Sequence, residues 1–126
     1  MTRVFINGYG NIGRRLASAI LGDKEIQLLG IAKYTADEKT QEALQNGLDI
    51  YVPKEKMEEF TEKSYRPMGI IEQAVEGCDI VIDAAKEGGG FLNKRKIYNP
   101  MNKPAIFQGG EHRHGKYSVA DMIHNS

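Results

Sequence analysis

Short apolar runs alternate along the chain with segments in which apolar residues recur every three or four positions. Residues 4–6 and 26–32 are nearly continuous apolar runs, typical of strands buried on both faces of a parallel sheet. Between them, residues 11–21 carry apolar side chains at the three- and four-residue spacing of an amphipathic helix. The chain therefore begins with a predicted strand, helix and second strand.

The same alternation continues to residue 107. Thr35 and Glu38 have the spacing of a capping box, which opens a short polar helix that Gly47 ends. Further strands are predicted at residues 50–52, 79–83 and 105–107, and further helices over residues 54–63, 70–75 and 92–98. This order predicts right-handed βαβ units in an α/β fold, with ligands bound at the carboxyl ends of the strands.

Size and composition narrow the possible classes of protein. The 126 residues suit one domain spanning residues 1–126, and 17 basic residues balance 17 acidic ones, so charge favours neither nucleic acid nor an anionic membrane as partner. The sequence has no apolar run of membrane-spanning length and no secretory leader pattern. Cys78 is the only cysteine, so no internal disulfide or cysteine-based metal site is expected, and it is interpreted as a core residue. We expect a cytoplasmic protein without a metal.

A glycine motif follows the first predicted strand and opens the first predicted helix. Residues 8–13 read GYGNIG. Gly8 permits a tight turn, Gly10 lets the backbone approach a pyrophosphate, and Gly13 lets the helix pack closely on the strand. The helix N-terminus then offers N–H groups to the phosphates. In this position the motif predicts a Rossmann-type, doubly wound, mostly parallel sheet with helices on both faces; the alternative is a glycine-rich turn without a ligand.

The second strand ends at Lys33, about 20 residues beyond the motif. Domains that prefer NAD usually carry an acidic residue here, which accepts a hydrogen bond from the ribose 2′-hydroxyl. A lysine instead pairs with a 2′-phosphate, so Lys33 predicts NADP as the preferred cofactor, with NAD also accepted. Tyr34 and Thr35 are candidates for the adenosine pocket. The alternative for Lys33 is a solvated lysine at a strand end.

Two further loops follow predicted strands. The loop that begins after Asp83 and contains Ala85 is expected beside the nicotinamide ribose, and Gly109 and Gly110 are expected on the nicotinamide side. Both segments could also be plain turns.

His112, His114 and His124 lack metal-ligand spacing.

The opening sequence FINGYGNIGRR, at residues 5–15, resembles that of glyceraldehyde-3-phosphate dehydrogenases, enzymes of glycolysis. The segments GIAK at 30–33, DIYVP at 49–53 and AIFQGGE at 105–111 make the chain similar to the archaeal type II phosphorylating branch. The resemblance covers about residues 1–111. It implies that Asn11 and Ile12 contact the dinucleotide, that Lys33 supports use of both cofactors, and that Gly110 lies near the nicotinamide. One departure is Ala85-Lys86, where the family often has Thr-Pro.

The resemblance also implies a catalytic cysteine in a Ser-Cys-Asn-Thr motif, which this sequence does not contain. We therefore expect a cofactor-binding domain that has no catalytic residue and is inactive alone, as in a truncated enzyme. An exposed apolar face would then favour a homo-oligomer or docking on a missing catalytic domain. The alternatives are a stand-alone nucleotide-binding or regulatory module and another Rossmann oxidoreductase such as a semialdehyde dehydrogenase, which the FQGGE segment disfavours.

Overall fold

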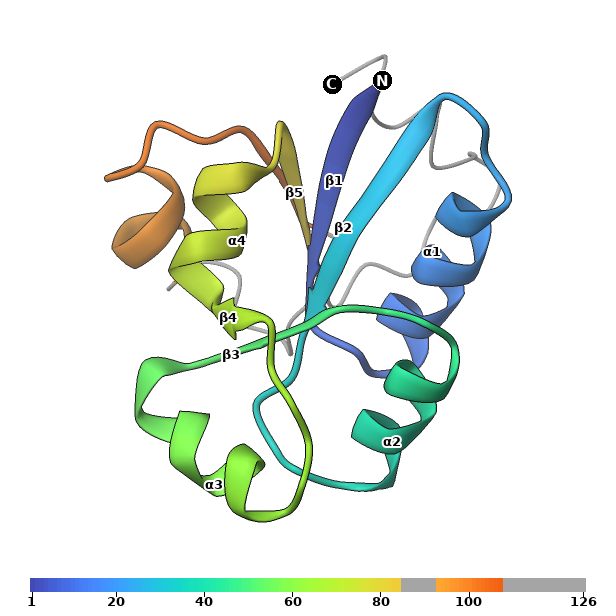
Figure 1. Ribbon diagram of the computed structural model, residues 1–126. Coiled ribbons are helices and arrows are strands. Elements are labelled where there is room, and N and C mark those ends of the chain that lie inside the picture. Colours follow the sequence, from blue (N-terminus) through green and yellow to red (C-terminus); the bar gives the residue numbers. More distant parts are fainter. Residues whose placement is uncertain (85–92, 108–126) are drawn as a thin grey trace.

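The sheet forms the centre of the molecule. The computed structural model describes residues 1–84 and 93–107 (Figure 1). Within them lie six strands in the order β4-β3-β2-β1-β5-β6, and every neighbouring pair is parallel. The strands are β1 (Thr2–Asn7), β2 (Ile26–Ala32), β3 (Ile50–Val52), β4 (Gly69–Ile70), β5 (Ile80–Asp83) and β6 (Ala105–Phe107). The parallel sheet predicted from the apolar runs is confirmed.

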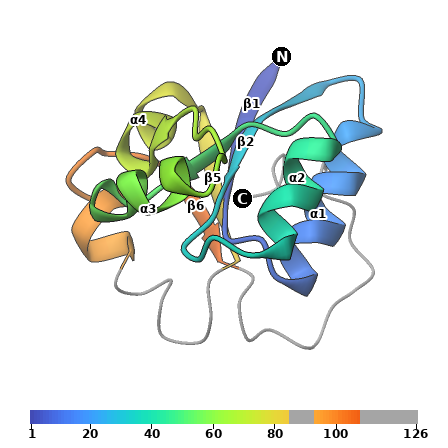
Figure 2. The ribbon, with the colours of Figure 1, turned by 60° about the horizontal axis from the view of Figure 1, so that its bottom comes forward.

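Helices cover both faces of this sheet, as Figures 1 and 2 show. They are α1 (Asn11–Leu21), α2 (Glu38–Gln45), the 3-10 turn η1 (Lys54–Lys56), α3 (Met57–Glu62), α4 (Ile71–Gly77) and the π-helical turn η2 (Lys94–Tyr98). Helices α1 and α2 lie on one face, where Arg14 Nη2 and Glu42 Oε1 join them at 2.7 Å. Helix α4 and η2 lie on the other face.

Two apolar cores fill the space between the layers. On the α1 and α2 side, Ile6, Ile31 and Ile50 of the central strands are fully buried. On the α4 side, Phe5 packs edge-on against Tyr51 with ring centroids 5.7 Å apart. Alternate residues of one strand therefore point into different cores, so both faces of β1 are covered, as its uninterrupted apolar run predicts. This is a Rossmann-type, doubly wound α/β fold.

Three details differ from the sequence-based elements. Helix α2 is capped by Asp37 with Thr40 as the reciprocal partner, so the predicted pairing of Thr35 with Glu38 is wrong. Thr35 and Asp37 are both preferred N-cap residue types, so residue type alone does not distinguish them. The short strand β4, paired with β3, was not predicted, because two residues are too few to show a period. The segment predicted as one helix over residues 54–63 is divided into η1 and α3.

The order of the strands defines where the chain reverses direction across the sheet. From β1 the chain adds β2, β3 and β4 on one side, and then returns to place β5 and β6 on the other. Asn7 and Asp83 are register partners at the carboxyl ends of β1 and β5. The boundary between β1 and β5, where the strand order reverses, is the switch point of the sheet, and in open parallel sheets the crevice beyond this point binds ligands.

No helix of the described residues is long and apolar enough to cross a membrane.

Candidate functional site

The turn between β1 and α1 is fixed by close backbone packing. Gly8 adopts a φ of 129°, a conformation that side chains with a Cβ rarely adopt. A Cβ atom on Gly13 would lie 2.3 Å from the Gly8 carbonyl oxygen and 3.7 Å from Ile6 Cγ2. Helix α1 therefore lies against the end of β1 at a separation that only glycine permits, and the structural roles predicted for Gly8 and Gly13 are confirmed.

Gly10, in contrast, faces open space. A Cβ atom added there would meet no described heavy atom within 4 Å. Gly10 is the N-cap of α1, its side chain is only a hydrogen, and no described side chain caps this helix. Asn11 and Ile12, in the first turn, are exposed, and Ile12 is one of the large apolar side chains left accessible. Among the described residues, this end of α1 thus presents backbone N–H groups without a side-chain cap, beside the exposed side chain of Ile12.

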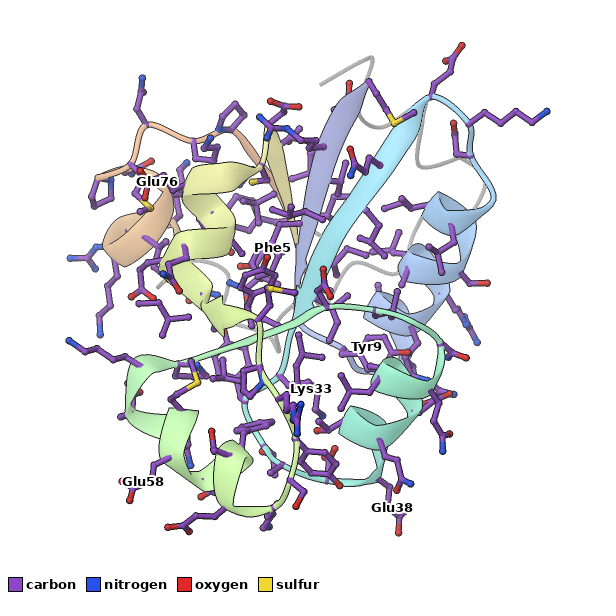
Figure 3. The ribbon with its side chains drawn as sticks, in the orientation of Figure 1. Phe5, Tyr9, Lys33, Glu38, Glu58 and Glu76 are labelled. Atoms are coloured by element: carbon purple, nitrogen blue, oxygen red, sulfur yellow. The ribbon has the colours of Figure 1, made fainter. Side chains whose placement is uncertain are left out.

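Lys33, the residue after β2, is buried rather than solvated. Its side chain is 8% exposed, and its Nζ lies 2.8 Å from Asp37 Oδ1. In Figure 3 it is labelled between the ribbons of α2 and α3. The alternative interpretation of Lys33 as a solvated surface lysine is therefore wrong. Burial alone would raise the pKa of Asp37, but the hydrogen bond and charge of Lys33 hold that pKa below its usual value.

The loop that carries Tyr34, Thr35 and Asp37 is held by side chains from other elements. The Tyr65 hydroxyl donates to the Asp37 carbonyl oxygen at 3.3 Å, and Lys63 Nζ donates to the Ala36 carbonyl oxygen at 3.4 Å. Thr40 Oγ1 donates to the carbonyl oxygen of Thr35, whose side chain is exposed. The loop after β2 is thus fastened to α2 and to the chain at the end of α3.

A network of hydrogen-bonded side chains, here called the polar cluster, lies at the carboxyl edge of the sheet, where β1 and β5 end. Its members are Asn7, Tyr34, Asp83, Asn93 and Tyr98. The Tyr34 hydroxyl donates to Asn7 Oδ1 at 2.5 Å, and Asn7 Nδ2 donates to the Tyr98 hydroxyl oxygen at 2.8 Å. The Tyr98 hydroxyl and Asn93 Nδ2 both donate to Asp83 Oδ2, the latter at 2.9 Å. Each hydrogen bond fixes the direction of the next.

Burial within the polar cluster keeps its two phenols protonated. Burial, and then the charge of Asp83, raise the pKa of Tyr34 to about 12. The same two causes raise the pKa of Tyr98 above its usual range. Both hydroxyls therefore remain donors at neutral pH, that of Tyr34 to Asn7 Oδ1 and that of Tyr98 to Asp83 Oδ2. The cluster ties the loop after β2 to β1, β5 and η2.

Sequence reasoning predicted neither the polar cluster nor the pairing of Asp37 with Lys33. The signal available was Asp83 at the end of an apolar strand, since a buried carboxylate requires partners. Tyr34, predicted to lie in an adenosine pocket, is 39% exposed although its hydroxyl points inward. Ala85, Gly109 and Gly110 lie outside the described residues.

Cys78 is buried at the opposite end of β5, and burial raises the pKa of its thiol to about 11. A protonated, buried thiol is a poor nucleophile, which agrees with its interpretation as a core residue. Within residues 1–84 and 93–107, no three His, Cys, Asp or Glu side chains are grouped so as to hold a metal ion.

Comparisons with known proteins point to one enzyme family. A glyceraldehyde-3-phosphate dehydrogenase from Metallosphaera sedula is 39% identical over 122 residues, which are 97% of this chain and 34% of that protein. The corresponding protein of Hyperthermus butylicus is 40% identical over 120 residues, which are 95% of this chain and 34% of that protein. The chain thus spans about a third of the length of the curated relatives that it matches.

Among solved structures, an NAD-binding protein from Listeria innocua superposes with a TM-score of 0.45 at 20% identity, over 85% of this chain and 35% of that one. No protein-family model matches the chain. The sequence comparisons nevertheless name the same family that the motifs in the sequence predicted. Over nearly its whole length, the chain is similar to archaeal glyceraldehyde-3-phosphate dehydrogenases, and the family resemblance predicted from its motifs is confirmed.

Proposed function

We propose that this chain binds a nicotinamide dinucleotide at the carboxyl edge of its sheet, with NADP preferred and NAD accepted. In this proposal it is the cofactor-binding part of a glyceraldehyde-3-phosphate dehydrogenase-like oxidoreductase. The observation that carries the proposal is the turn at residues 8–13, at the switch point of the sheet: among the described residues no side chain caps the helix that it opens, and no atom lies within 4 Å of a Cβ added to Gly10. Such an arrangement suits a pyrophosphate.

The surrounding residues fit the rest of a dinucleotide. Gly10 and Asn11 would receive the pyrophosphate through backbone N–H groups, and the exposed side chain of Ile12 would cover apolar surface of the ligand. Lys33, at the end of the neighbouring strand, would pair with a 2′-phosphate. Tyr34 and Thr35 would border the adenosine. These residues bind and orient the cofactor, which supplies the hydride acceptor when bound.

The remaining contacts are proposed from the similarity to the archaeal enzymes. Ala85 is proposed near the nicotinamide ribose, and Gly109 and Gly110 near the nicotinamide ring. Oxidation and phosphorylation of an aldehyde by the whole protein, a homo-oligomer or docked catalytic domain as partner, and a cytoplasmic location likewise stay predictions. The similarity to the archaeal enzymes is their support.

Calorimetric titration with NADP and with NAD tests the proposal. We expect Lys33→Ala to weaken NADP binding by about tenfold and NAD binding by much less, since only NADP carries the 2′-phosphate. The matched control is Lys24→Ala, which removes an exposed lysine before the opposite end of β2. If neither dinucleotide binds the parent chain at millimolar concentration, the proposal is wrong. Equal loss of both ligands would remove the role given to Lys33.

A further inference from the structure

We propose that Asp37 limits the preference of this site for NADP over NAD, by holding and neutralising the Lys33 ammonium group. The inference rests on the proposed function and adds a second specificity-determining residue to it. Lys33 and Asp37 then act as one ion pair. The combined charge of this pair, rather than that of Lys33 alone, interacts with the 2′-substituent of the bound ribose.

The geometry makes Asp37 hard to displace. Its Oδ1 atom accepts from Lys33 Nζ at 2.8 Å, from the backbone N–H of Lys39 at 3.1 Å and from that of Thr40 at 3.3 Å. The last two bonds cap α2, so a carboxylate that rotated away from Lys33 would also give up the helix cap. The backbone of the loop is held in addition by Tyr65 and Lys63.

The accessibility of the pair determines which partner an incoming group meets. The Lys33 side chain is only 8% exposed, whereas that of Asp37 is 42% exposed. A 2′-phosphate that approaches the ammonium group from solvent therefore comes close to the Asp37 carboxylate as well. Two anions would then share one cation, and their repulsion cancels part of the attraction to Lys33.

NAD does not meet this penalty, because its 2′-hydroxyl is uncharged. A hydroxyl can donate a hydrogen bond to a carboxylate oxygen, as the acidic residue after β2 accepts one in NAD-preferring domains. The Lys33–Asp37 pair thus offers a cation to one cofactor and an acceptor to the other. The dual use of cofactors then follows from one ion pair.

The test is a titration of the Asp37→Asn variant with both dinucleotides. Asparagine keeps a side-chain oxygen to cap α2 but carries no charge. We expect NADP to bind about three- to tenfold more tightly, with NAD affinity changed by less than about twofold, and the gain to shrink at high salt. Glu38→Gln is the matched control, since it removes an exposed charge from the adjacent residue, whereas the ion pair with Lys33 is made by Asp37.

A double variant shows whether Asp37 acts through Lys33. In the Lys33→Ala background, Asp37→Asn should change the NADP-to-NAD affinity ratio by less than about twofold. A rise of both affinities alike, an unchanged ratio, or an equal gain from Glu38→Gln would overturn the inference while leaving dinucleotide binding in place. Absence of binding to the parent chain would instead overturn the proposed function. Asp37→Ser, which also caps without a charge, replaces the variant if Asp37→Asn does not fold.

Discussion

The glycine turn after β1 and the polar cluster beneath it meet at Asn7 and Gly8, yet they are stabilised in different ways. The turn depends on backbone atoms packed at distances that exclude a Cβ, all within residues 6–13. The polar cluster depends on hydrogen bonds between residues as far apart as Asn7 and Tyr98, 91 positions away. The turn has no room for a Cβ atom at Gly13 but has room for one at Gly10. The polar cluster, in contrast, is destabilised when one of its buried polar groups loses its hydrogen-bond partner.

The largest expected effect is at the turn. Gly13→Ala should lower the free energy of unfolding by about 3 kcal/mol, because its Cβ would lie 2.3 Å from the Gly8 carbonyl oxygen and the backbone would have to move. Urea unfolding measures the loss. Gly10→Ala is the control within the same turn: with nothing within 4 Å, it should cost less than about 1 kcal/mol. Equal losses would contradict the steric account.

A smaller loss is expected at the polar cluster. Tyr98→Phe removes the hydroxyl that accepts from Asn7 and donates to Asp83, so two buried groups lose a partner. The expected cost is about 2 kcal/mol in the free energy of unfolding. Tyr65→Phe, which removes one longer bond to the Asp37 carbonyl oxygen, should cost under about 1 kcal/mol by the same measurement. A Tyr98→Phe variant as stable as the parent would show that the cluster contributes nothing to stability.

The smallest expected effect is a pH dependence of stability that arises from the polar cluster and not from the glycine turn. Because the pKa of Tyr34 is raised from 10.0 to about 12, the folded chain holds a proton that the unfolded chain releases. This contribution to stability is fully present below pH 10 and is lost as pH rises through about 12. Urea midpoints measured across this range should fall less steeply for Tyr34→Phe than for the parent, whereas Gly10→Ala should leave the slope unchanged. Parallel slopes for the parent and Tyr34→Phe would contradict this assignment.

The same contrast explains what the sequence could predict. Helix α1, strand β2 and the glycine turn depend on neighbours within one βαβ unit, and their periodicity and glycine spacing predict them. The position of Lys33 directly after β2 was also predicted from the sequence. The burial of Lys33 and its pairing with Asp37 were not predicted, because they depend on how helix α2 is capped. The polar cluster joins four separate segments, and no pattern along the chain brings Asn7, Asp83 and Tyr98 together.

The central place of β1 has a consequence for how the chain acquires its structure during synthesis. On one side, strand β1 pairs with β2, the next strand to be synthesised. On its other side it pairs with β5, and the register partner of Val4 there is Ile80, 76 positions later in the chain. Until β5 is synthesised, the first strand is an open edge of a four-stranded intermediate, with unpaired backbone groups and apolar side chains such as Phe5 exposed to other chains. The strand that precedes the glycine turn is thus an unprotected sheet edge until β5 pairs with it, and its exposure ends only when residues 80–83 have been made.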